Sequence, residues 1–253
     1  MVLTLDIGNS RVHAGLFVRG RLTQAIKVSH DGFLSRAQAQ AFLKRLKVKP
    51  DGVSLASVVP AVSRLLTLEI RRRWGLKPLI VSDRTKTGLA RICYERRTLG
   101  ADRIAGAVGA WRRYQRDLIV IDFGTATTFN VVSRRGDFAG GLICPGVETS
   151  LHSLLARTSL LPRTKLGAPR HTIGRTTEAC IRAGIILGTV AMVDGLVARI
   201  NRERKRSHLV IATGGWSRLF ARLARSIERY DEYLNLRGAY EIYRINEKTV
   251  VDN

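Results

Sequence analysis

Two stretches of the chain carry residue types that could handle phosphate. The first is "VLTLDIGNSRVHAGLF", residues 2–17, and the second is "LIVIDFGTATTFNVV", residues 118–132. Each runs from an apolar stretch into Asp-x-Gly with small polar residues, and then into a second apolar stretch. The two aspartates, Asp6 and Asp122, stand nearly half the chain apart, so the pattern is an internal repeat.

The chemistry of such a loop suits a nucleoside triphosphate. Glycine lets backbone N–H groups approach phosphate oxygens, Asn or Thr adds side-chain donors, and a carboxylate at the strand end can hold Mg²⁺ beside the phosphates. A plain hairpin needs only Gly or Asn for positive φ, and it does not need the Asp. A purely structural turn is the alternative for either copy taken alone. Neither Gly-x-x-x-x-Gly-Lys-Ser/Thr nor Gly-x-Gly-x-x-Gly occurs in the sequence.

The segments around the two loops alternate between strand and helix patterns. We predict strands at 52–59 and 78–82 and helices at 62–74 and 104–114 between the loops. After the second loop come a strand with "GGLICPG", two long helical stretches, the strand "HLVIATGG" and a last helix. This order predicts an α/β protein with two related lobes, 1–116 and 117–253, each a mixed sheet with helices, and an ATP cleft between them.

Composition sets further limits. The chain has 253 residues, of which 45% are hydrophobic, and this is enough for a substantial core. The three cysteines are widely spaced and form no Cys-x-x-Cys, so we expect neither a disulfide framework nor a zinc site. We expect the apolar stretch at 183–193 to be too short to span a bilayer, and we place the chain in the cytoplasm, with no membrane partner.

The charge is strongly positive, with 43 Lys and Arg against 20 Asp and Glu, a net +23. Such a field attracts anionic ligands and, less selectively, nucleic acid. The basic residues stand in short groups beside apolar helical patterns, which is typical of solvated helix faces. No nucleic-acid-binding signature accompanies them. We therefore expect nucleic acid to bind non-specifically if it binds, although a selected polyanion site remains the alternative.

Six motifs, in order along the chain, resemble those of the type III pantothenate kinase family. They are Asp-x-Gly-Asn-Ser at residue 6, "GADR" at 100–103, "DFGTATT" at 122–128, "GGLICPG" at 140–146, "IGRTTEA" at 173–179 and "IATGG" at 211–215. The resemblance implies two actin-like (ribonuclease H-like) lobes and ATP-dependent phosphorylation of pantothenate, the first step of coenzyme A synthesis. It also implies Mg²⁺, K⁺ or NH₄⁺ as a monovalent cation, and a homodimer.

The resemblance assigns the ATP phosphates to the first loop and to Thr125 in the second. The first-loop residues are Asp6, Ile7, Gly8, Asn9, Ser10, Arg11, Val12 and His13. In this assignment Asp6 also faces Mg²⁺ and Asp122 binds the monovalent cation.

The resemblance further makes Asp102 the general base for the pantothenate hydroxyl and Arg103 the partner of the pantothenate carboxylate. The other substrate-binding residues that it implies are Tyr94, Gly100, Ala101 and Thr177. Plain structural roles remain open for these residues. Asp102 also fits a helix N-cap, Arg103 a solvated surface residue, and Thr177 or its neighbour Thr176 a helix start.

Gly214 and Gly215 would let adenine approach the backbone, and tight strand-to-helix packing explains them about as well. The chain departs from the family pattern in three places. Ser10 follows Asn9 where the family has Thr, Thr176 stands where it has Asn, and "YERRTLGADR" lacks Asn-Pro and is one residue shorter between Tyr94 and Gly100.

Two other functions compete with this interpretation. One is a repurposed relative that acts as a regulatory accessory factor or binds nucleic acid, and the other is a kinase or ATPase of the same superfamily with another substrate. The presence of Asp6, Asp102 and Asp122 together favours catalysis. The stretch "CIRAGIILGTVAMVDGLVARI" at 180–200 is apolar around most of a helix, so we expect either a central core helix or one that packs against a second subunit.

Overall fold

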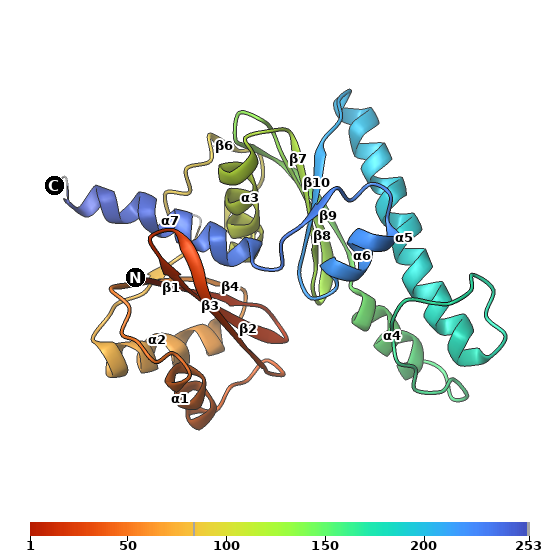
Figure 1. Ribbon diagram of the computed structural model, residues 1–253, viewed down its shortest axis with the longest axis horizontal. Helices are drawn as coiled ribbons and strands as arrows, with labels where there is room; N and C mark the ends of the chain where they lie inside the picture. The colour runs from red at the N-terminus through yellow and green to blue at the C-terminus, as the bar shows by residue number, and fades with distance from the viewer. Residues whose placement is uncertain (83, 252–253) are drawn as a thin grey trace. The chain divides into compact units, whose positions relative to one another are not determined.

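The computed structural model describes residues 1–82 and 84–251 (Figure 1). The chain forms two compact units, and each is described by itself. The first unit comprises Met1–Gln115, Val132–Gly140 and Tyr233–Asn253, and the second comprises Arg116–Val131 and Gly141–Glu232.

The first unit is built on a five-stranded sheet with the order β3-β2-β1-β4-β5. Its strands are β1 Val2–Ile7, β2 Arg11–Val18, β3 Arg21–Ser29, β4 Gly52–Ser57 and β5 Leu79–Ile80. The central strand β1 pairs antiparallel with β2, where Ile7 lies opposite Val12, and parallel with β4, where Asp6 lies opposite Ala56. The first Asp-x-Gly loop is therefore the three-residue connection between two antiparallel strands, as the two flanking apolar stretches predict.

Helices cover both faces of this sheet (Figure 1). They are α1 Arg36–Lys44, α2 Pro60–Trp74, α3 Ala101–Tyr114 and α7 Leu234–Val251. Leu3, Leu5 and Ile7 of β1 belong to the core cluster that contains the buried residues of α1 and α2. Because successive side chains on a strand point to opposite faces, Asp6 points to the other face, where α7 packs against β1.

Glycines allow α3 and α7 to cross in backbone contact. A Cβ added to Gly238 would overlap the carbonyl oxygen of Ala105, and one added to Gly109 would lie 3.0 Å from the amide nitrogen of Gly238. This crossing ties the C-terminal helix to the helix that carries Asp102.

The two units differ from the predicted lobes in two segments. Trp111 of α3 donates a hydrogen bond to the carbonyl of Arg134, 3.3 Å away, and a Cβ on Gly136 would lie 2.8 Å from the Trp111 ring. The turn after β8 therefore packs with the first unit. Residues from Tyr233 onward also join that unit, because α7 packs on α3 and β1.

The other sheet has six strands in the order β11-β10-β7-β8-β9-β6. The bounds are β6 Arg91–Ile92, β7 Leu118–Phe123, β8 Ala126–Val132, β9 Asp137–Pro145, β10 Leu209–Thr213 and β11 Arg229–Tyr230. Its strands β9-β8-β7-β10-β11 repeat the arrangement of β3-β2-β1-β4-β5, and β10 runs parallel to β7 as β4 does to β1. The internal repeat and the α/β fold with two mixed sheets are confirmed.

The remaining helices are α4 Val147–Ala156, α5 Thr177–Arg204 and α6 Ser217–Leu223, and a short 3₁₀ helix spans Arg96–Thr98. The single last helix of the prediction is two helices, α6 and α7, separated by β11. Helix α3 begins at Ala101, three residues before the predicted start, because its N-cap is Gly100 and no capping side chain marks the position.

Helix α5 corrects the expectation that no stretch is long enough for a bilayer. By length and composition alone α5 could cross one, since an 18-residue window has a mean hydropathy of 1.8. A single helix of this kind is weak evidence for a membrane. The central-core alternative is also wrong for this unit, because only 28% of that window is buried. A Cβ on Gly184, Gly188 or Gly195 would meet nothing within 4 Å.

Candidate active site

Asp6 lies near the end of β1, where its carboxylate faces α7. Its Oδ2 accepts a hydrogen bond from the side-chain amide of Asn235, at 3.2 Å. The loop that follows is closed by the Gly8 N–H, which donates to the Arg11 carbonyl at 3.0 Å. The Ser10 carbonyl accepts from the His30 amide at 2.9 Å, so the end of β3 also supports the loop.

The glycines of the two Asp-x-Gly loops are not explained by backbone strain or close packing. Neither Gly8 nor Gly124 has a positive φ. A Cβ on Gly8 would lie 3.7 Å from its nearest neighbour, and one on Gly124 would lie 3.6 Å from its nearest, both ordinary contacts. A plain hairpin therefore does not require glycine at either place. The N–H groups of Gly8 and Gly124 donate within their own loops, to the carbonyls of Arg11 and Ala126 at 3.0 and 3.1 Å, so a phosphate group would have to meet the amides of the residues that follow them.

The side chains of the first loop divide into two sets. Ile7 and Val12 are fully buried in the core with α1 and α2, so their side chains are not available to a ligand. Asn9, Ser10 and Arg11 are exposed, and His13 is partly buried.

Asp102 lies in the first turn of α3, one position after its first residue. The helix N-cap is Gly100, so the expectation of Asp102 as N-cap does not hold. The Asp102 Oδ1 accepts a hydrogen bond from the Arg103 amide at 2.7 Å. Burial raises the pKa of the Asp102 carboxyl, against the smaller opposing effects of that hydrogen bond and the Arg103 charge. A Cβ on Gly100 would lie 2.5 Å from Asp102 Oδ1, so the glycine makes room for the carboxylate.

Arg103 is buried, with only 7% of its surface exposed, and it is not the solvated surface residue of the alternative interpretation. Its guanidinium carbon lies 5.1 Å from the Tyr94 ring centroid and 5.6 Å from that of Phe138. The two rings contact each other edge to face, with centroids 6.1 Å apart. Despite the shortened segment before Gly100, Tyr94 thus packs directly on Arg103. Ala101, also assigned to the substrate, is buried.

A chain of contacts connects this cluster with the first Asp-x-Gly loop. The Val58 amide donates to the Ile7 carbonyl at 3.1 Å. A Cβ on Gly100 would lie 3.5 Å from Val58 Cγ1. The N-terminus of α3, with Asp102 and Arg103, therefore lies at the carboxyl ends of β1 and β4, where Asp6 and Gly8 are found.

In the second unit, Asp122 occupies the position on β7 that Asp6 has on β1. It pairs in register with Thr213 of β10. A Cβ on Gly214 would overlap Asp122 Oδ1 and lie 2.7 Å from the Phe123 carbonyl oxygen, and Gly214 has φ +86. Packing and backbone conformation thus explain Gly214 without adenine, and Gly215 follows it in the same turn.

The second loop is fastened from α4. Gly146 and the Thr149 hydroxyl both donate to the Thr125 carbonyl, at 3.1 and 2.6 Å, and the Thr125 side chain is exposed.

Elsewhere in this unit, Thr176 is the N-cap of α5, and its hydroxyl accepts from the Ala179 amide at 3.2 Å. The exposed Thr177 is therefore not the cap.

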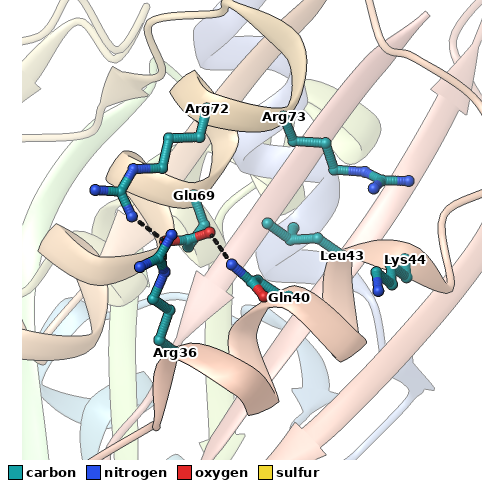
Figure 2. Close-up of a pocket in the computed structure, with 7 residues that line it drawn as sticks. All are labelled: Arg36, Gln40, Leu43, Lys44, Glu69, Arg72 and Arg73. Atoms are coloured by element: carbon teal, nitrogen blue, oxygen red, sulfur yellow. Dashed lines mark hydrogen bonds and ion pairs between the residues drawn. The ribbon is translucent and has the colours of Figure 1, made fainter.

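A separate pocket of about 380 Å³ lies between α1 and α2, on the sheet face opposite Asp6 (Figure 2). Its lining residues are Arg36, Gln40, Leu43, Lys44, Glu69, Arg72 and Arg73. Glu69 accepts hydrogen bonds from Arg36, Gln40 and Arg72 at 2.9–3.0 Å. The Gln40 bond is the largest of the effects that lower the pKa of Glu69. This pocket contains none of the predicted site residues, and its buried carboxylate ties the two helices together.

Among the described residues, no group of three or more His, Cys, Asp or Glu side chains could hold a metal ion alone. This fits Mg²⁺ that arrives with a nucleotide, because such an ion takes one or two protein carboxylates and most of its other ligands from phosphates and water. Asp6, which stands beside the glycine of the first Asp-x-Gly loop, can supply such a protein carboxylate. Asp122, close to the Phe123 carbonyl, offers the oxygen donors that suit a monovalent cation.

Two residues of the site were not predicted. Phe138 completes the aromatic contact on Arg103, and Asn235 bonds Asp6 across 229 positions. A polar residue between Leu234 and Leu236 is the only signal in the sequence for Asn235, and it does not reveal the partner.

The family model described as type III pantothenate kinase matches residues 2–199. A type III pantothenate kinase from Moorella thermoacetica is 35% identical over 97% of this chain and 100% of its own length. One from Anaeromyxobacter sp. strain K is 38% identical over the same shares. Among solved structures, a ROK family glucokinase from Streptomyces griseus, in complex with glucose and AMPPNP, has a TM-score of 0.54 at 13% identity and covers 96% of this chain and 99% of that one. The last likeness concerns the fold alone.

Proposed function

The chain belongs to the type III pantothenate kinase family, and on that premise we propose that it transfers the γ-phosphoryl group of ATP to the primary hydroxyl of pantothenate. This reaction is the first step of coenzyme A synthesis. The observation that carries the proposal is the cluster at the N-terminus of α3. There a partly buried carboxylate and a buried guanidinium lie beside the carboxyl ends of β1 and β4.

Asp102 acts as the general base. Burial raises the pKa of its carboxyl, which makes the ionised form a stronger proton acceptor for the pantothenate hydroxyl. Arg103 binds the pantothenate carboxylate. The faces of Tyr94 and Phe138 hold its planar guanidinium, whose N–H groups suit a carboxylate. Gly100 and Ala101 shape the same end of the helix, and Thr177 contributes a hydroxyl to the substrate.

The two Asp-x-Gly loops bind the ATP phosphates. The backbone amides that follow Gly8 and Gly124 donate to phosphate oxygens, with the side chains of Asn9, Ser10, Arg11, His13 and Thr125 as further donors. Asp6 holds Mg²⁺, which neutralises charge on the phosphates when it is bound. The buried Ile7 and Val12 support the first loop from the core.

Replacing Asp102 tests the catalytic assignment. Asp102→Asn keeps the shape and the acceptor for the Arg103 amide but removes the base, so we expect turnover to fall by roughly 10²-fold or more. The affinity for ATP should change little. Turnover and ATP binding should be measured in a coupled assay with pantothenate and a panel of small hydroxy acids and sugars.

Asp51→Asn is the matched control, because Asp51 is exposed at the opposite end of β4. Full turnover in Asp102→Asn contradicts the role of Asp102. Faster phosphorylation of another acceptor contradicts pantothenate as the substrate.

Asp122 binds a potassium-type cation. Two carboxylates near one triphosphate repel it unless a second cation offsets the charge, and a large monovalent ion accepts carboxylate and carbonyl oxygens. We expect pantothenate phosphorylation to be much slower in sodium than in potassium at equal ionic strength. Asp122→Ala should lose the potassium stimulation and most of the ATP affinity. Equal wild-type rates in the two salts contradict this assignment.

The enzyme functions as a homodimer in the cytoplasm. Only 28% of the apolar window of α5 is buried within the chain, and a second copy of the helix would bury more of it. This supports the dimer.

A further inference from the structure

The side-chain amide of Asn235 donates to Asp6 Oδ2 at 3.2 Å, and Asn235 is only 8% exposed. We propose that Asn235 is a positioning residue for the phosphate site, which orients the Asp6 carboxylate. This inference rests on the proposed function of Asp6. It adds a residue from a segment that lies beyond residues 2–199, the range that the family model matches.

The packing of α7 fixes the direction of Asn235. Its neighbours Leu234 and Leu236 are both buried, and Leu236 packs against Gly15 of β2. Gly238 lies against the backbone of α3, so the helix can neither rotate nor withdraw without losing that contact. Tyr240, one turn further along, stacks on Phe17 with ring centroids 4.6 Å apart. The amide is therefore held toward Asp6 by packing on both sides of it.

An asparagine has a specific advantage at this place. A hydrogen bond from a donor that is itself held by packing fixes the direction of the carboxylate that accepts it. Lys or Arg would do the same, but a positive charge there would compete with the metal ion for the carboxylate. A neutral amide orients Asp6 and leaves its negative charge available to Mg²⁺.

The test compares two asparagines on the same helix. Asn235→Ala removes the donor to Asp6. The control, Asn246→Ala, removes an amide that donates to the Lys86 and Ile242 carbonyls at 2.8 and 2.7 Å. Asn235→Ser, which keeps a shorter donor, tests for rescue. All variants are made in the full chain, and circular dichroism and the thermal midpoint check their folding.

Two measurements separate positioning from simple structural support. The first is the Mg²⁺ concentration that gives half-maximal affinity for ATP, measured by calorimetry or thermal shift, and the second is the change in KM for Mg·ATP compared with the change in kcat. For Asn235→Ala we expect a Mg²⁺ requirement about tenfold higher, the usual scale of a hydrogen bond to a charged group, and a KM for Mg·ATP that rises more than kcat falls. Asn246→Ala should move neither, and Asn235→Ser should recover part of both.

Equal behaviour of Asn235→Ala and Asn246→Ala in both measurements overturns the inference. The ATP-binding measurement does not depend on pantothenate. A wild-type chain that binds Mg·ATP but does not phosphorylate pantothenate therefore contradicts the proposed function and leaves the Asn235 comparison intact. A wild-type chain that binds no Mg·ATP overturns both.

Discussion

The Asp102 carboxylate sits where its ionised form is poorly solvated, and this should cost folding stability. Because burial raises its pKa in the folded state, the protonated form stabilises the fold. That contribution is fully present below the ordinary Asp pKa of about 3.9 and is lost as the pH rises through the raised folded value. At neutral pH the ionised group therefore destabilises the fold.

Asp102→Asn should consequently raise the thermal midpoint at pH 7. Each kcal/mol corresponds to about 2–4 °C in a chain of this size. The gain should shrink as the pH falls toward 4, and scanning calorimetry across that range measures it. The exposed Asp51→Asn variant should show little change at either pH. A lower midpoint for Asp102→Asn at pH 7 would show that the Arg103 interactions outweigh burial.

The sequence predicted some residues of this site and missed others. Asp6, Asp102 and Arg103 stand in short motifs, so their types and spacing pointed to chemistry. The sequence motifs gave no reason to treat Gly8 and Gly214 differently. In the structure, neither φ nor packing requires a glycine at Gly8, whereas Gly214 has φ +86 and packs against Asp122. Asn235 was missed because its contact with Asp6 depends on how α7 crosses α3, and no local pattern encodes that crossing.

At the scale of elements, strands and amphipathic helices were predicted well where periodicity was clear. The two hairpins and α2 follow the expected ranges, because alternating and 3.6-residue patterns report directly on burial. The start of α3 was missed because Gly100 supplies no capping side chain. The expected lobes missed the return of α7 to the first unit, since a helix pattern shows which face is apolar but not which sheet it covers.

Helix α5 makes a prediction about assembly. Its buried residues are Ile181, Ala183, Ile186, Val193 and Val197, and much of its remaining surface is also apolar. Light scattering at micromolar concentration, without detergent, should give about twice the 28.1 kDa chain mass. Gly188→Arg, which puts a charge on an open glycine, should shift the protein toward monomer, whereas Arg199→Ala on the same helix should not. A fully active monomer, or a chain that stays dispersed only in detergent, would contradict the dimer.

At the scale of the whole molecule, the net charge of +23 predicts how nucleic acid behaves toward this enzyme. Attraction that comes from a basic surface is sequence-independent and screened by salt. Two unrelated labelled DNA duplexes should therefore bind with similar affinity, and that affinity should fall about 10³-fold or more between about 50 and 200 mM salt. Fluorescence anisotropy measures this. Binding to one duplex that persists at the higher salt would instead support the regulatory alternative.

The return of α7 to the first unit also determines when that unit can become complete during synthesis. β1 is made long before α7, yet Asp6 depends on Asn235 and Phe17 on Tyr240. Until residues 234–251 have been made, the sheet face that carries Asp6 lacks its helix. Pairing of distant segments is slow and leaves apolar surface open to aggregation in the meantime. We therefore expect a chain that ends before residue 234 to leave this face of the sheet uncovered and to be prone to aggregation.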